Sequence, residues 1–178
     1  MSDTNDTLSN VQGQMSLPEK IAAFVPGFRG YKEKELRRES DRLIRNHLYL
    51  KLSLEKTDLR EIEQKLADRR YFDVLTDMDR LLAKMDRVVE KVNHASYGYS
   101  GFFDAVKVRE ENLDHMIDFD NKLLDGINAL ATEIDAFKAD LASDATANLK
   151  TRVQNVTDKL ESLESTFDQR NEVILGVS

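Results

Sequence analysis

Residues 31–95 form a long stretch of this chain that contains neither glycine nor proline. Both residues interrupt helices, because glycine loses the most conformational freedom on folding and proline cannot donate a backbone hydrogen bond. Apolar residues recur in this stretch at steps of three and four, which is the spacing of one helical face. The stretch therefore predicts long helices, and an unbroken helix of this length would extend for roughly 100 Å.

The composition agrees with a helical chain. One third of the 178 residues are charged, tryptophan is absent, and there are only seven glycines and two prolines, a profile typical of long helices and coiled coils. The lack of cysteine excludes disulfides, thiolate catalysis and zinc fingers, and fits a cytoplasmic chain. No apolar run is long enough for a membrane span and no signal peptide is visible. We expect a cytoplasmic protein.

We predict an all-α fold, either an elongated antiparallel coiled-coil hairpin or a bundle of three to four long helices. Residues 1–15 are polar and read as a disordered leader, and residues 16–178 as a single helical domain. A capping box formed by Ser16 and Glu19 begins a short amphipathic helix at 17–25. Long helical segments follow at about 31–95 and 102–175. We expect breaks in these segments near 57 and 144, where the apolar register slips and a polar patch occurs.

The two long segments have predicted apolar seams, meaning rows of apolar residues along one helical face. In the first segment the seam contains His47, which we interpret as core or interface packing, and Asp120 is a polar intrusion in the second. At several positions two adjacent residues are both apolar, and we call these doubled positions. They make the apolar stripe of the helix wider than a two-stranded seam, which favours a bundle or contacts between copies. The first seam is Leu36, Leu43, Leu50, Leu54, Leu59, Ile62 and Leu66, and the doubled positions are Leu81/Leu82, Val88/Val89 and Leu123/Leu124.

Two segments share the pattern glycine, aromatic, any residue, glycine, aromatic, at 27–31 and 98–102. Similar residues flank both copies at the same offset, which we interpret as a tandem duplication of a helix, aromatic turn and helix. The first glycine of each pair can adopt the left-handed conformation that ends a helix. A GxxG pair alone is weak support for a phosphate site, so we predict structural turns, formed by Gly27, Gly30, Gly98, Tyr99, Gly101 and Phe102.

Catalytic and metal motifs are weak throughout the sequence. Glu111, His115 and Asp118 share a helical face, as metal ligands could, but no second copy of the motif exists on another helix. A solvated charged face is the favoured interpretation. We therefore assign no catalytic, cofactor-binding or metal-ligating residue, expect no cofactor, and expect a protein that is not an enzyme; a metal-dependent helical enzyme is the third hypothesis.

The short helix and the basic stretch after it form the candidate interaction surface. Residues 29–51 carry eight Lys/Arg against four acidic residues, although the whole chain has a net charge of −7. An amphipathic helix beside basic residues can lie on an anionic bilayer, but it could equally cap the end of a bundle. Nucleic acid is a disfavoured partner because the rest of the chain is acidic. The surface comprises Ile21, Phe24, Val25, Phe28, Arg29, Lys32, Arg37 and Arg38.

Two strings, PGFRGYKEKELRRESDRLIR (26–45) and ASYGYSGFFDAVKVREENLDHMIDFD (95–120), resemble those of a family of prokaryotic helical proteins without an established activity. The layout of a short amphipathic helix, a proline and long antiparallel helices is similar to phage-shock protein A and the ESCRT-III proteins. Our first hypothesis is a non-enzymatic helical scaffold that self-associates or binds a protein partner. The alternative is a peripheral membrane protein that docks through residues 17–28 and the basic stretch 29–51.

Overall fold

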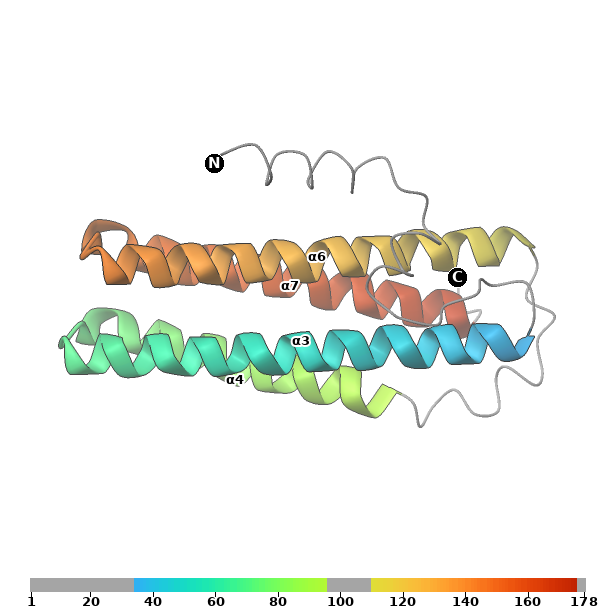
Figure 1. The fold of residues 1–178 in the computed structure, drawn as a ribbon, viewed down its shortest axis with the longest axis horizontal. Coiled ribbons are helices and arrows are strands. Elements are labelled where there is room, and N and C mark those ends of the chain that lie inside the picture. Colours follow the sequence, from blue (N-terminus) through green and yellow to red (C-terminus); the bar gives the residue numbers. More distant parts are fainter. Residues whose placement is uncertain (1–33, 96–109, 176–178) are drawn as a thin grey trace, which may run out of the picture. The chain divides into compact units, whose positions relative to one another are not determined.

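The computed structural model describes residues 34–95 and 110–175, and it confirms the all-α prediction. These two ranges contain no β-strand. The helices are α3 (Lys34–Asp68), α4 (Phe72–His94), α6 (Glu110–Ala142) and α7 (Leu149–Leu175), with a short 3-10 helix, η2 (Thr146–Asn148), before α7 (Figure 1). The predicted leader, the short helix at 17–25 and both glycine–aromatic turns fall on residues outside these ranges.

The chain divides into two compact units, residues 1–47 and residues 48–178. In the first unit the described residues belong to the beginning of α3, where Ile44 and Arg45 are buried. The second unit contains the rest of α3 together with α4, α6 and α7. All further description of packing concerns this second unit.

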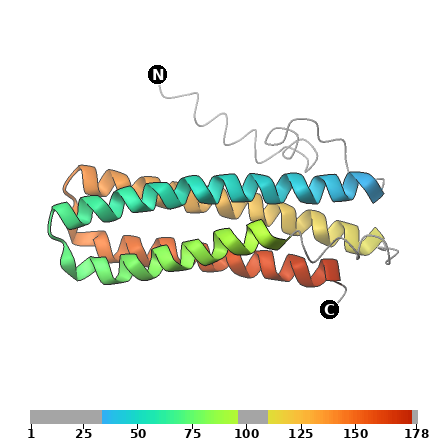
Figure 2. The same cartoon turned by 90° about the horizontal axis from the view of Figure 1, so that it is seen from below.

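Within residues 48–175 the four helical segments form an antiparallel bundle of two hairpins (Figures 1 and 2). Helices α3 and α4 form one hairpin, and α6 and α7 form the other. Each helix has two neighbours, in the order α3, α4, α7, α6 around the bundle. Ion pairs mark all four contacts: Lys56–Asp86 between α3 and α4, Lys84–Glu161 between α4 and α7, Arg152–Glu133 at 2.8 Å between α7 and α6, and Lys138–Asp58 at 3.0 Å between α6 and α3.

The core of this unit is built from apolar residues at helical spacing. In α7 the buried positions follow each other at steps of four and three over its whole described length, as the sequence predicts. Two of the three doubled pairs are also internal, since both members of Val88/Val89 and of Leu123/Leu124 are buried, whereas Leu82 is half-buried. Most of the extra width of the stripe therefore lies inside one chain. The α7 core residues are Leu149, Val153, Val156, Leu160, Leu163 and Phe167.

The predicted seam of α3 is wrong in its first half. Leu50 and Leu54 are 66% and 56% exposed, and the buried row of this unit runs instead through Leu48, Leu52, Glu55, Leu59, Ile62 and Leu66. This row continues at steps of three and four without a slip. The prediction failed because Glu55, a charged residue, occupies a core position. A search for apolar residues alone does not include it.

The predicted break near 57 is also wrong, because α3 continues to Asp68. The turn lies at residues 69–71, where Arg70 adopts a left-handed backbone conformation with φ of 62°. The backbone N–H of Tyr71 donates to the carbonyl of Leu66 at 2.9 Å, and that of Arg70 donates to the carbonyl of Ala67 at 3.0 Å. This pair of bonds is the Schellman motif that ends helices. This turn could not be expected from residue types, since glycine usually takes the left-handed position.

The second hairpin turns at residues 143–145, which include Asp144, where the second break was expected. Asp144 has φ of 55°, and the N–H of Ala145 donates to the carbonyl of Asp140 at 2.9 Å. Aspartate tolerates this conformation better than most residues. The helices of this second hairpin, α6 and α7, also approach each other closely at Gly126. A Cβ atom at this position would lie 3.0 Å from Leu163 Cδ1, so the absence of a side chain allows the close approach.

Candidate functional site

The contact between α4 and α7 carries the most distinctive charge pattern among the described side chains. On α4, four basic residues follow one another at steps of four, three and four, which places them on one helical face. They are Arg80, Lys84, Arg87 and Lys91. A basic row of this kind needs either solvent or a complementary surface beside it.

Helix α7 supplies the complementary charges for part of this row. Lys84 pairs with Glu161, and Lys91 Nζ lies 2.6 Å from Glu164 and 3.0 Å from Asp168. Partial burial alone would lower the pKa of Lys91, but the hydrogen bonds to the two carboxylates outweigh it and raise that pKa. Lys84 and Lys91 are therefore matched in charge by α7.

The half of the α4–α7 contact that lies nearer the two hairpin turns is not matched in charge. Its one cross-helix ion pair among the described residues joins Lys150 to Asp73 at 3.6 Å, with both side chains largely exposed. Between this pair and Lys84–Glu161, α7 presents the neutral residues Gln154 and Thr157 toward α4. Arg80 donates to Asp77 of its own helix at 3.1 Å instead of reaching across.

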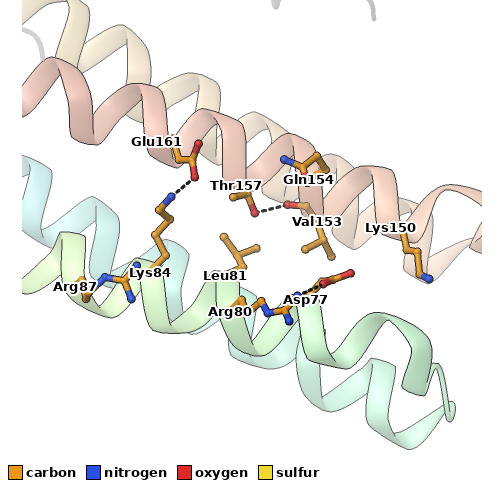
Figure 3. Close-up of a pocket in the computed structure, with 10 residues that line it drawn as sticks. All are labelled: Asp77, Arg80, Leu81, Lys84, Arg87, Lys150, Val153, Gln154, Thr157 and Glu161. Atoms are coloured by element: carbon orange, nitrogen blue, oxygen red, sulfur yellow. Dashed lines mark hydrogen bonds and ion pairs between the residues drawn. The ribbon is translucent and has the colours of Figure 1, made fainter.

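A pocket of about 350 Å³ lies at this gap (Figure 3). Its lining carries four cationic side chains and two carboxylates, a net charge of +2 in a chain whose net charge is −7. Figure 3 shows side chains from both helices bordering the hollow, with Leu81 and Val153 between the polar groups. The lining residues are Asp77, Arg80, Leu81, Lys84, Arg87, Lys150, Val153, Gln154, Thr157 and Glu161.

A second notable surface is the outer face of α3. Leu50 and Leu54 are separated by four residues and so share one face of the helix. Both are more than half exposed, whereas Leu48 and Leu52 on the opposite face are buried in the core. In this part of the chain α3 is therefore apolar on two faces.

Charged side chains also occupy core positions of the second unit, where a pattern of apolar residues alone does not reveal Arg170 or Glu55. Arg170 Nε donates to Asp120 at 2.5 Å between α7 and α6, and the two side chains are 1% and 0% exposed. This pair explains the polar intrusion that Asp120 makes in its seam. Arg170 itself continues the α7 seam three residues after Phe167, so extending the seam through charged residues would have found it.

Glu55, on α3, is a further buried charged residue. Burial raises the pKa of its carboxyl group, and the nearby carboxylates of Asp58 and Asp135 raise it further, against a smaller lowering by Lys51 and Lys138. No hydrogen bond or ion pair from a described residue reaches this carboxyl group. Glu55 is thus a core acid whose pKa lies above that of an ordinary glutamate.

Most residues of the predicted interaction surface lie outside the described ranges. Arg37 and Arg38 belong to α3, but their side chains, like those of Glu111 and His115 on α6, are not described. Asp118 is exposed and His47 is half-buried. Among the described side chains no group of three or more potential ligands could hold a metal ion. Nor does any described helix combine the length and apolar character needed to cross a bilayer.

Comparisons with protein-family models, with curated proteins and with solved structures give no match to this chain. The family and architectural resemblances of the sequence therefore stay predictions.

Proposed function

We propose that this protein is a non-enzymatic helical interaction module that self-associates through the outer face of α3. The observation that supports the proposal is the exposure of Leu50 and Leu54, one helical turn apart, on a helix whose opposite face already forms the core. A helix at the surface of a bundle needs one apolar face, and the other is normally polar. A second apolar face supports contact with another molecule.

A second copy of the chain is the occupant that we propose. Leucines at this spacing fit between the side chains of a facing helix. In a dimer whose two-fold axis is perpendicular to α3, the two α3 helices would lie antiparallel, so that Leu50 of one copy faces Leu54 of the other. Leu50 and Leu54 of each copy would then form the whole contact between the two chains.

The expected association is weak. Burying the exposed part of each leucine contributes about 1–2 kcal/mol, and two leucines per chain cover far less area than a permanent interface. The doubled apolar positions add nothing to this contact, because most of them are buried within the chain. We therefore expect a dimer that forms as protein concentration rises.

Light scattering and sedimentation velocity over a range of protein concentrations test the proposal. The natural chain should shift from monomer to dimer, and the double variant Leu50→Glu/Leu54→Glu should stay monomeric with an unchanged helical circular dichroism spectrum. Phe72→Glu is the matched control, since Phe72 is 64% exposed at the start of α4. A natural chain that stays monomeric, or a dimer that only Phe72→Glu disrupts, would contradict the proposal.

A further inference from the structure

We infer that the pocket between α4 and α7 is a binding site for a compact phosphate-class anion, with pyrophosphate as the simplest representative. This site is separate from the outer face of α3 and does not depend on self-association. It follows from the local mismatch between the charges of the two helices.

The mismatch lies between the Lys150–Asp73 and Lys84–Glu161 pairs, and Arg87, one turn beyond Lys84, adds a cation that no described residue of α7 pairs. At Lys84 and Lys91, α7 provides Glu161, Glu164 and Asp168 as counter-charges. Toward the hairpin turns α7 provides no carboxylate to the pocket, and Gln154 and Thr157 occupy the corresponding positions. A bound anion would supply the negative charge that α7 lacks there.

Two of the four cations are available for such a ligand. Arg87 is exposed and forms no ion pair with any described residue. Lys150 has only the exposed, 3.6 Å contact with Asp73, and pairs of that kind contribute little. Arg80 and Lys84 are each paired with one carboxylate and add local positive potential. A guanidinium group can bind phosphate oxygens through two parallel hydrogen bonds, and lysine acts as a point charge.

The shape of the pocket favours a compact anion. Its volume of about 350 Å³ is at the lower end of the range for small-molecule sites. Leu81 and Val153 are buried beneath it and form an apolar floor, which reduces the screening of charges by water. Asp77 and Glu161 lie on its border, so an extended acidic peptide would meet like charges, whereas a compact anion can contact the cations alone.

Isothermal titration calorimetry of the full chain with pyrophosphate, at constant ionic strength, tests the inference. We expect saturable binding with a dissociation constant of about 1 mM or tighter. The variant Arg87→Gln/Lys150→Gln should bind about tenfold more weakly, which corresponds to about 1.4 kcal/mol. The control Arg60→Gln/Lys122→Gln removes the same charge from exposed positions outside the pocket and should bind as the natural chain does.

Several results would overturn the inference. One is the absence of saturable binding up to about 10 mM pyrophosphate. Another is an equal loss of affinity in both double variants, which would show that the anion responds to net charge alone. Citrate serves as a polyanion without phosphate, and equal binding of citrate would refute the phosphate class. Thermal unfolding of each variant establishes that these exposed substitutions leave the bundle folded.

Discussion

Arg69 joins the two hairpin turns of the bundle through Asp144. Its Nη1 atom lies 2.5 Å from the carboxylate of Asp144 and donates to the carbonyl of Leu141 at 2.6 Å. The carbonyl belongs to the last turn of α6, where helices have carbonyl groups without partners. One side chain from the first turn therefore caps the helix that ends in the second turn. This contact fixes both hairpins at the same end of the second unit.

Replacing Arg69 by alanine should lower the free energy of unfolding by about 1 kcal/mol. The estimate is modest because both side chains are partly exposed to solvent. Urea unfolding followed by circular dichroism provides the measurement. Arg60→Ala is the control, since Arg60 is exposed and its nearest carboxylate, on Asp86, is 4.0 Å away. Equal losses in the two variants would show that Arg69 has no special role.

Replacing Arg70 by glycine should raise the free energy of unfolding, by up to about 1 kcal/mol. The left-handed conformation at φ of 62° costs an L-residue about 1–2 kcal/mol, and glycine avoids this cost but gains freedom in the unfolded chain. Thermal unfolding measures the net effect. Arg60→Gly, the same substitution inside α3, should instead destabilise by about 1 kcal/mol. A loss of stability in Arg70→Gly would refute the strain argument.

The sequence predicted those parts of the fold that depend on one helix at a time. The seam of α7 and the turn at Asp144 can be identified from apolar spacing and from a run of small polar residues. The turn at Arg70 could not be predicted, because arginine favours helix and no glycine or proline marks the position. Local backbone hydrogen bonds of Arg70 and Tyr71 close the turn, and the neighbouring Arg69 contacts the other hairpin.

The candidate pocket could not be predicted for a different reason. Its two walls, α4 and α7, are distant in the sequence, and neither is unusual alone. The basic row of α4 becomes informative only when α7 is placed beside it and its missing carboxylates can be seen. In contrast, Glu55 and Arg170 are accessible to sequence analysis once charged residues are allowed at seam positions.

Glu55 makes the stability of the bundle depend on pH. Burial, followed by Asp58 and Asp135, raises the pKa of this carboxyl group in the folded state. Between the ordinary value near 4.5 and the raised pKa of the folded state, the unfolded chain has largely lost this proton while the folded chain still largely retains it. The contribution of Glu55 to stability therefore falls as pH rises through this window, and stays low above the folded-state pKa.

The variant Glu55→Gln should consequently be more stable than the natural chain at pH 7, by about 1 kcal/mol or more. The difference should shrink as the pH is lowered toward about 4.5. Urea unfolding at several pH values provides the measurement, with Glu61→Gln as the control because Glu61 is exposed on the same helix. A gain of equal size at every pH would contradict the proposed titration of Glu55.

The buried pair of Asp120 and Arg170 should show strong coupling between its members. Removing either partner leaves the other charge buried without this ion pair, so Asp120→Leu or Arg170→Leu alone should lower the free energy of unfolding by about 3–5 kcal/mol. The double variant replaces both charges with apolar side chains and should recover most of that loss. A double-mutant cycle, measured by urea unfolding, gives the coupling energy directly. Additive losses in the double variant would show that the two residues stabilise α6 and α7 independently, in spite of the 2.5 Å contact between them.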